Sequence, residues 1–494
     1  MFGLTRSPEL QAPGLTWFNV DGPLCLSAMR GQIILLDFWT YCCVNCMHVL
    51  PTLKRIEEAF EDQVRVIGVH SPKFSAERDP DNLAHAIARY GISHAVVHDP
   101  GFYLWDQYAI RAWPTLVLIA PNGYIVGVIE GEPNADRLID GLGTMVRDQA
   151  ETGTIAPLNF ASAPSKTPKS SLCFPSKIKR LPTQGGGKQW AVSDANHHQI
   201  VVFDDEGHEI RRYGCGSAGF TDGPGDTARF NQPQGLACDD RSIFVADTGN
   251  HAIRKIDRET GFVLTQAGTG ERGAILGEPS AARSTALSSV WDLVLDGERV
   301  YFANAGTHQL GFLDVETGTL SPIAGSGIEG IQDGPALDAH LAQPSGLAMD
   351  GKARRLYFVD SETSAVRYLS LGKDPQVTTL VGEGLFEFGH INGPFETSRM
   401  QHPLGLCLWE GKIVVADSYN ARLRVLDLVH GHTHDLGETA FANADGLCLP
   451  AGEPAGVTSD GPDRLLMVDT NNHRILEIRP KSGLIRTWTG SVFL

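Results

Sequence analysis

Three of the chain's nine cysteines, Cys42, Cys43 and Cys46, lie within five consecutive positions. They follow an apolar run at 33–39 and precede a helical apolar stripe, so they stand where a buried strand gives way to a helix. A helix N-terminus favours negative charge, and a cysteine placed there can become a reactive thiolate. Thiol–disulfide exchange needs one sulfur to attack and a second within reach to resolve the mixed disulfide, which is the spacing of Cys43 and Cys46.

Two other uses of these sulfurs have to be weighed. A Cys-x-x-Cys pair can be half of a zinc site, with His48 and His70 as further ligands, but the chain has no second Cys-x-x-Cys. The strand-to-helix position favours redox chemistry, so no metal and no cofactor beyond the dithiol is expected. Cys42 is either a third redox sulfur or a small buried filler, and we favour the filler because free cysteine packs as a small hydrophobe.

The segments around the cysteines predict an α/β domain with a mixed sheet. The continuous apolar run at 33–39 is typical of a strand covered on both faces. Pro121-Asn122-Gly123 predicts a hairpin between two further strands. The other expected elements are helices at 47–60, 82–90 and 135–148, a helical stretch at 104–109, and strands at 64–69, 116–120 and 124–129.

The composition changes at about residue 151, where Pro, Ser, Thr and Lys replace the apolar periodicity until about residue 172. This is the composition of a linker. We therefore expect a first domain at 1–150, a linker at 151–172 and a second domain at 173–494.

A turn that begins with Asp or Asn recurs six times after the linker, at positions 194, 247, 304, 360, 417 and 469, between short strands. Most units carry Pro-x-Gly-Leu or Pro-x-Gly-Val upstream, but the first has Pro175-Ser-Lys-Ile and the third has Val290-Trp-Asp-Leu. Six all-β repeats of about four strands each predict a six-bladed β-propeller. A histidine recurs at the same turn position in four of the repeats, as His198, His251, His308 and His473. Because a ring of blades holds these side chains far apart, we expect them to be turn residues and not ligands of one metal ion.

Charge and hydropathy indicate which partners and which compartment to expect. The net charge is −17 and no basic face stands out, so nucleic acid and anionic membrane are poor candidate partners. No apolar run approaches the roughly 20 residues of a spanning helix, and no export signal is recognisable at the N-terminus. We therefore expect a cytoplasmic protein whose scattered cysteines are free thiols. Nothing in the sequence sets the oligomeric state.

The repeats resemble the NHL family of propellers over roughly residues 173–490, through tripeptides such as Asn250-His251-Ala252 and Asn472-His473-Arg474. The first domain resembles the thioredoxin fold, closest to the periplasmic or membrane-tethered thiol-disulfide reductases. In that branch Phe-Trp-Ala-x-Trp-Cys-x-x-Cys ends the central strand, and Phe38-Trp39-Thr-Tyr-Cys42-Cys43-Val-Asn-Cys46 aligns with it without a gap. A thioredoxin-like domain followed by six NHL repeats resembles the NHL repeat-containing protein 2 family, and the likeness spans nearly the whole chain.

The resemblance implies roles for individual residues. Cys43 would be the nucleophile and Cys46 the resolving cysteine, while Cys42 occupies the usual tryptophan position beside Trp39. Trp113-Pro114-Thr115 would form the cis-proline loop that packs against the active-site disulfide. Asp37 matches the buried aspartate that takes the proton from the resolving thiol, although it could equally be a strand-end polar group held by water.

Two functions follow, with two weaker variants. The chain is either a thiol-disulfide oxidoreductase whose propeller docks a protein substrate, or a scaffold with a redox-inactive or thiol-sensing thioredoxin-like module. Docking would use inter-strand loops, such as those marked by Asp222-Gly-Pro, Asp333-Gly-Pro and Asn392-Gly-Pro. Thr40-x-x-Cys43 echoes a peroxidase motif, but Leu36 stands where that motif has proline. An enzyme site in the propeller would need a unique polar cluster in the central channel.

Overall fold

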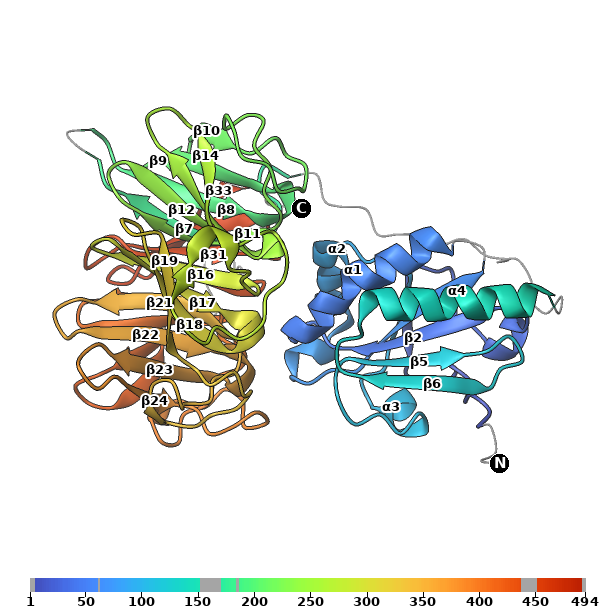
Figure 1. Cartoon of the computed structure of the whole chain (residues 1–494). Coiled ribbons are helices and arrows are strands. Elements are labelled where there is room, and N and C mark those ends of the chain that lie inside the picture. Colours follow the sequence, from blue (N-terminus) through green and yellow to red (C-terminus); the bar gives the residue numbers. More distant parts are fainter. Residues whose placement is uncertain (1–4, 61–62, 152–169, 184–185, 437–450, 491–494) are drawn as a thin grey trace. The chain divides into compact units, whose positions relative to one another are not determined.

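The computed structural model describes residues 5–60, 63–151, 170–183, 186–436 and 451–490. The chain divides into two compact units, Met1–Thr167 and Pro168–Leu494 (Figure 1). The first unit is an α/β domain and the second is a β-propeller. None of the helices in the described part of the chain is both long and apolar enough to cross a membrane.

A six-stranded mixed sheet forms the centre of the first unit. Its strands lie in the order β1 (Thr16–Phe18), β4 (Ala95–His98), β3 (Val64–His70), β2 (Ile33–Trp39), β5 (Thr115–Ile119) and β6 (Ile125–Glu130). Strands β2, β3 and β4 run parallel, and the other pairs are antiparallel. Every residue of β2 is buried, as its continuous apolar run predicts.

Helices cover both faces of this sheet (Figure 1). Helices α1 (Val44–Ala59) and α4 (Ala135–Glu151) pack on one face, where Leu35 joins their apolar side chains in a core. The 3₁₀ helix η1 (Leu26–Met29) and α3 (Tyr103–Gln107) contribute to the core of the opposite face, which contains Leu36 and Phe38. The connection from β3 to β4 holds η2 (Ala76–Arg78) and α2 (Pro80–Tyr90). Because side chains alternate along a strand, Asp37 shares the α1 face with Leu35.

The expected elements of the first domain are present with small shifts. The strand at 33–39 is confirmed with the same bounds, and the hairpin at Pro121-Asn122-Gly123 is confirmed between β5 and β6. Helix α1 starts three residues earlier than predicted, at Val44, with Cys43 as its N-cap. Strands β1 and β4 were not predicted, since three and four residues are too few for a periodic signal.

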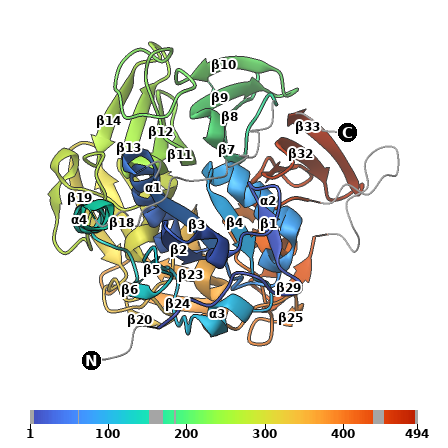
Figure 2. The ribbon, with the colours of Figure 1, turned by 90° about the vertical axis from the view of Figure 1, so that its right-hand side faces the viewer.

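The second unit is the predicted six-bladed propeller, with blades set in a ring (Figure 2). Blades 1 to 3 contain β7 (Pro175–Leu181), β8 (Gln189–Asp194), β9 (Gln199–Asp204) and β10 (Glu209–Tyr213); β11 (Pro233–Cys238), β12 (Ser242–Asp247), β13 (Ala252–Asp257) and β14 (Val263–Ala267); and β15 (Ser280–Ala281), β16 (Val290–Asp296), β17 (Arg299–Asn304), β18 (Gln309–Asp314) and β19 (Thr319–Ala324).

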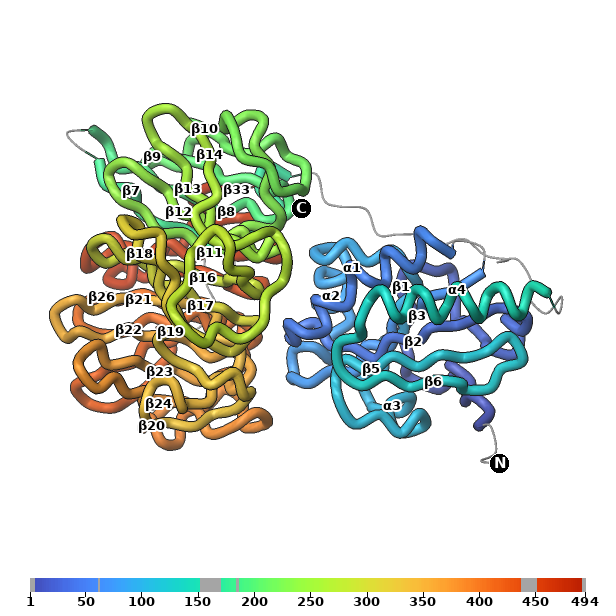
Figure 3. Tube along the Cα trace, viewed as in Figure 1, coloured from blue at the N-terminus to red at the C-terminus, as the bar shows by residue number. Residues whose placement is uncertain are grey.

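Blades 4 to 6 follow the same plan, and Figure 3 shows the backbone trace of the strands of blade 4. They contain β20 (Gly334–Pro335), β21 (Pro344–Asp350), β22 (Arg355–Asp360), β23 (Ala365–Ser370) and β24 (Gln376–Val381); β25 (Gly393–Pro394), β26 (Gly405–Trp409), β27 (Lys412–Asp417), β28 (Arg422–Asp427) and β29 (His432–Asp435); and β30 (Pro454–Ser459), β31 (Leu465–Asp469), β32 (Arg474–Arg479) and β33 (Leu484–Gly490). The two-residue strands β15, β20 and β25 add a fifth, outermost strand to three of the four-stranded meanders. Short 3₁₀ turns accompany the strands at η3 (Ala195–His197), η4 (Thr248–Asn250), η5 (Ala282–Ser284), η6 (Ala305–Thr307), η7 (Ser361–Thr363) and η8 (Ser418–Asn420).

The recurring turn joins neighbouring blades. Its histidine has left-handed backbone and is a turn residue, as predicted. In the four blades that have this histidine, its Nδ1 also accepts a backbone N–H of the next blade at 2.9–3.1 Å. The donors are Gln232 for His198, Ser289 for His251, Gln343 for His308 and Phe174 for His473. The last of these closes the ring from blade 6 to blade 1. An accepting Nδ1 requires the neutral imidazole, with its proton on Nε2.

The Asp or Asn that begins each turn is equally structural. Its Oδ1 accepts a backbone N–H in all six blades, for example that of Ala342 on Asp360 at 2.8 Å. In three blades the other oxygen pairs with a fully buried arginine, as Arg367 does with Asp360 at 2.8 Å. That arginine also binds the first residue of the Gly-Pro loops, Asp222, Asp333 or Asn392. In each of these three blades, the turn aspartate, the buried arginine and the loop Asp or Asn therefore form one polar network that links the turn to the loop.

Candidate functional site

The three clustered cysteines differ in their exposure to solvent. Cys43 is partly exposed and caps α1, and its carbonyl accepts the Met47 N–H at 3.2 Å. Cys42 and Cys46 are only 2% and 1% exposed. Burial, a hydrogen bond with the Cys43 side chain and the charge of that side chain raise the pKa of Cys46 well above its ordinary value. The pair therefore consists of an accessible sulfur at the helix start and a buried, protonated thiol one turn later.

Asp37 is a buried carboxyl with a strongly shifted pKa. It is 1% exposed, and its Oδ1 has no hydrogen-bond partner among the residues that the structure describes. Burial raises the pKa of Asp37 from 3.8 to about 7. The charge of Asp37 also raises the pKa of Cys46, so the two groups interact on the α1 face of the sheet. A carboxyl that titrates near neutral pH can both take up and release a proton under physiological conditions.

Pro114 lies at the same end of the strands as the cysteine loop, just before β5. Strand β5 pairs with β2 so that Thr115 is opposite Phe38, which brings the segment before β5 beside the end of β2. The Trp113–Pro114 peptide bond is cis, and the Pro114 carbonyl accepts the Gly131 N–H at 2.8 Å. Trp113 packs against Trp105, with ring centroids 4.5 Å apart. The structure thus brings Asp37, Cys43, Cys46 and Pro114 to one end of the domain.

A buried glutamate that no sequence motif marks binds the cysteine loop. Glu77, in η2, is 0% exposed. Its Oε1 accepts the Thr40 hydroxyl at 2.7 Å and the Cys42 N–H at 3.0 Å. Its Oε2 accepts the N–H groups of Lys73 and Phe74, both at 2.8 Å. The Cys42 N–H is a backbone group that any residue has, and it lies 35 positions from Glu77, so the sequence carries no local signal of this contact. The Thr40 proton is donated to Glu77 and not to Cys43, which disfavours the peroxidase variant.

The histidines weighed as zinc ligands bind other groups. His48 Nδ1 lies 2.9 Å from Glu132 Oε1, and His70 Nδ1 lies 3.1 Å from His98 Nδ1. His70 is buried between Trp39, which meets it edge-on, and Tyr41, which stacks on it. Within the described ranges, no group of three or more His, Cys, Asp or Glu side chains could hold a metal ion.

The propeller axis carries two charged residues where the other four blades have glycine. Lys177 and Asp292 stand at the positions of Gly235, Gly346, Gly405 and Gly456. The Lys177 ammonium donates to the carbonyls of Leu404 and Ala455, and burial lowers its pKa to about 8. Asp292 is 2% exposed and accepts the Leu293 and Leu347 N–H groups at 2.8 and 2.9 Å. Both departures from the repeat are thus bonded to backbone groups of the inner strands.

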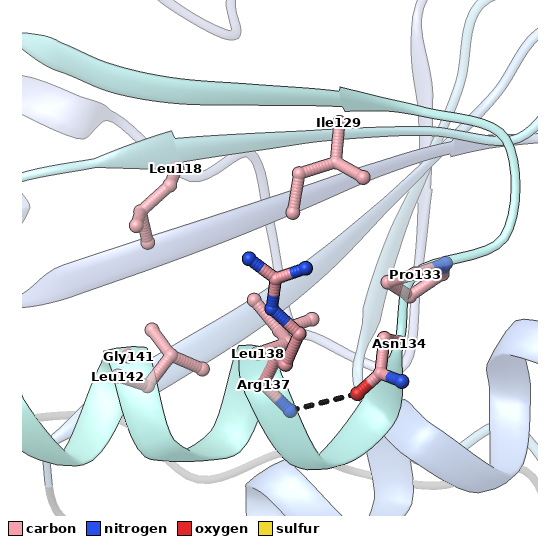
Figure 4. Close-up of a pocket in the computed structure, with 8 residues that line it drawn as sticks. All are labelled: Leu118, Ile129, Pro133, Asn134, Arg137, Leu138, Gly141 and Leu142. Atoms are coloured by element: carbon pink, nitrogen blue, oxygen red, sulfur yellow. Dashed lines mark hydrogen bonds between the residues drawn. The ribbon is translucent and has the colours of Figure 1, made fainter.

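A groove of about 480 Å³ opens between α4 and the β5–β6 hairpin (Figure 4). Its walls are mostly apolar, with Leu118 and Ile129 facing Leu138 and Leu142. Asn134 caps α4 at the end of the groove by accepting the Arg137 N–H at 2.9 Å. The lining contains no cysteine, histidine or carboxylate, so the groove offers no group for the chemistry discussed above.

The fold and the site define a class of protein that joins a thioredoxin-like domain to an NHL-repeat propeller. A thioredoxin-like family profile matches residues 31–125, and the NHL repeat profile matches 230–256 and 400–426. NHL repeat-containing protein 2 of Gallus gallus is 35% identical over 515 residues, which cover 95% of this chain and 70% of that protein. The chain belongs to the NHL repeat-containing protein 2 family.

Two further relatives cover different shares of the chain. The chloroplastic Protein SUPPRESSOR OF QUENCHING 1 of Arabidopsis thaliana is 36% identical over 97% of this chain, which spans only 47% of the plant protein. Thiol-disulfide oxidoreductase ResA of Halalkalibacterium halodurans is 32% identical over 132 residues, 26% of this chain and 70% of that protein. The first domain is therefore related to thiol-disulfide oxidoreductases.

Proposed function

We propose that this chain is a thiol-disulfide oxidoreductase that works through Cys43 and Cys46, with the propeller as the docking platform for a protein substrate. The observation that carries the proposal is the buried Asp37 carboxyl, whose pKa of about 7 lies near that of an efficient proton acceptor and which interacts with the buried thiol of Cys46. Burial of an unpaired carboxyl costs free energy, and a purely structural residue at the end of a strand would give nothing in return for that cost.

The exchange takes two steps. The Cys43 thiolate attacks one sulfur of the substrate disulfide, a mixed disulfide forms, and the other substrate sulfur leaves as a thiolate. Cys46 then gives its proton to the Asp37 carboxylate and attacks the Cys43 sulfur, which releases the second substrate thiolate. The two released thiolates take up protons. The substrate has gained two electrons, and the protein holds a Cys43–Cys46 disulfide that a dithiol reductant must reopen.

The direction of exchange depends on the compartment. In the cytoplasm expected from the sequence, thiols are kept reduced, so the exchange would run as reduction of a substrate disulfide. Val44 and Asn45, between the two cysteines, would tune the reduction potential of the pair together with the buried Asp37.

The propeller supports docking through the loops that connect one blade to the next. These loops carry exposed apolar side chains, with Phe220, Ile275, Ile328 and Phe386 exposed by 38%, 55%, 56% and 67%. Each of these loops runs from the outer strands of one blade to the innermost strand of the next blade. All four therefore lie on the same face of the ring. Such residues are available to a protein partner, whereas Asp222, Asp333 and Asn392 are bound within the blades.

Reduction of a model disulfide by the full chain tests the proposal against the scaffold alternative. We expect turnover in the presence of a dithiol reductant, loss of turnover in Cys43→Ser, and a single incomplete turnover in Cys46→Ser. Cys215→Ser removes an exposed thiol of the propeller and serves as the matched control. Turnover that is absent from the wild type, or that survives Cys43→Ser, would favour the scaffold with a redox-inactive module.

A further inference from the structure

The three neighbouring sulfurs pose a selection problem, because an accessible Cys42 would compete with Cys43 for the same substrate and for Cys46. In the structure, Cys42 is turned inward, with its Sγ 3.7 Å from the Thr40 hydroxyl. The rotamers that a side chain can adopt depend on its backbone φ and ψ, so a contact that holds the Cys42 backbone also restricts the direction of its thiol. The contacts of Glu77 are at this point of the backbone.

We infer that Glu77 is a positioning residue that selects Cys43 as the nucleophile by holding the Cys42 backbone and turning its thiol inward. The inference rests on the proposed function and deepens it. Glu77 Oε1 binds both the Cys42 N–H and the Thr40 hydroxyl, and so fixes the two residues on either side of Tyr41. Bonds to a charged acceptor are roughly twice as strong as neutral ones, and Glu77 is 0% exposed, so bulk solvent does not compete for its oxygens.

Glu77 is itself fixed in place from two sides. Its Oε2 accepts the Lys73 and Phe74 N–H groups, which tie the carboxylate to the segment after β3. The neighbouring Arg78 carbonyl lies 3.1 Å from His98 Nε2, so η2 is also attached to the end of β4. Asn82 donates to the Ala76 carbonyl at 3.0 Å and binds η2 to the first turn of α2.

A second contact chain supports the same loop. Tyr41 stacks on His70 with centroids 5.4 Å apart and ring planes at 13°, and His70 Nδ1 meets His98 Nδ1 at 3.1 Å. The cysteine loop is therefore attached to η2 twice, directly through the Glu77 carboxylate and indirectly through Tyr41, His70 and His98. Loss of the carboxylate contact would leave Tyr41 in place and free the residues on either side of it, including Cys42.

Differential alkylation of the reduced full chain tests this inference. The protein is treated with iodoacetamide at neutral pH, and the peptide that contains the three cysteines is analysed by mass spectrometry. In the wild type, Cys43 should be labelled well before Cys42. In Glu77→Gln, where an amide N–H₂ faces backbone N–H donors, labelling of Cys42 relative to Cys43 should rise by about tenfold or more. Asp99→Asn is the matched control, since Asp99 is a fully buried carboxyl that accepts the N–H groups of Tyr103 and Trp105.

Two further variants keep the test decisive if Glu77→Gln does not fold. Thr40→Val removes one bond to Glu77 with little change of shape and should raise Cys42 labelling, whereas Thr40→Ser keeps the hydroxyl and should behave as the wild type. Oxidised Glu77→Gln or Thr40→Val should contain some Cys42–Cys46 disulfide, and Cys42→Ser in the same background should restore a single Cys43–Cys46 pair.

Two results would overturn the inference. One is Cys42 labelling that stays at the wild-type ratio in both Glu77→Gln and Thr40→Val, and the other is Cys42 labelling as fast as that of Cys43 in the wild type. Neither readout needs turnover. A protein that reduces no disulfide but releases Cys42 in Glu77→Gln would contradict the proposed function and leave the selection of the sulfur intact.

Discussion

Asp37 should make the first domain less stable as the pH rises from 4 to 7, and Asp37→Asn should remove this dependence. Burial raises the folded-state pKa of Asp37 to about 7, while the unfolded chain titrates at 3.8. Between these values the folded state binds the extra proton, so the free energy of unfolding falls as the pH rises, by 1.36 kcal/mol per unit. The loss is complete above pH 7 and amounts to about 4 kcal/mol, an upper value because buried groups relax on ionisation.

The comparison with asparagine isolates the charge. An amide and a protonated carboxyl bury polar groups of similar size, so wild type and Asp37→Asn should be equally stable at pH 4. At pH 8 the variant should be more stable, by up to about 4 kcal/mol. Asp136→Asn removes an exposed carboxylate of α4 and should change the free energy of unfolding by no more than about 0.5 kcal/mol.

The assay has to report on one unit of a two-unit chain. Urea titrations followed by hydrogen exchange of peptides from β2 and β3, read by mass spectrometry, give the free energy of unfolding of the first domain within the full reduced chain. A difference between wild type and Asp37→Asn that is the same at pH 4 and pH 8 would refute the reasoning. A wild type that is the more stable protein at pH 8 would do so more strongly, because it would mean that the carboxylate is solvated or paired.

Three further predictions concern the propeller, each read by the same exchange method on propeller peptides. Lys177→Met should lower the stability of the propeller by about 1–3 kcal/mol at pH 10.5, where the lysine of the folded chain is neutral, because it leaves buried carbonyls without a donor. The wild type, whose Lys177 pKa falls from 10.5 to about 8, should gain stability from pH 8 to 10.5, and a flat profile would contradict the assignment. His198→Leu should cost about 1 kcal/mol at pH 8 through the lost bond from Gln232. Burial lowers the pKa of His198, so the wild type should lose stability as the pH falls below 6.5 and the variant should lose less; equal slopes would rule this out. Arg367→Met should cost about 3–5 kcal/mol by leaving the charge of Asp360 buried without its partner, and a change below 1 kcal/mol would show that water reaches the carboxylate.

Much of the architecture could be predicted because it rests on patterns that repeat or run long. The continuous apolar run of β2 allows few structures other than a strand covered on both faces. The turn histidines recur at one position in four blades, which identifies them as part of the repeat. The sequence also shows that four repeats have glycine at one position of the innermost strand. In the first and third repeats this position is Lys177 and Asp292, which the sequence shows only as departures from the repeat pattern.

The features that could not be predicted depend on contacts between distant segments. Glu77 binds the cysteine loop from 35 positions away, through the Thr40 hydroxyl and through the Cys42 N–H, a backbone group that any residue has. The pairing of His70 with His98 follows from the register of β3 and β4, and β4 was too short to be predicted. The bond from His251 to Ser289 crosses between blades and depends on how the ring closes, which a repeat unit does not show.

The mixed disulfide of Cys46→Ser is the most direct test of the central claim. The reduced variant of the full chain is mixed with a disulfide substrate, and the adduct is located by mass spectrometry after digestion. The account predicts one stable adduct per chain, on the Cys43 sulfur, which persists because the resolving thiol is absent. No adduct, or an adduct that forms on Cys42 in place of Cys43, would contradict it.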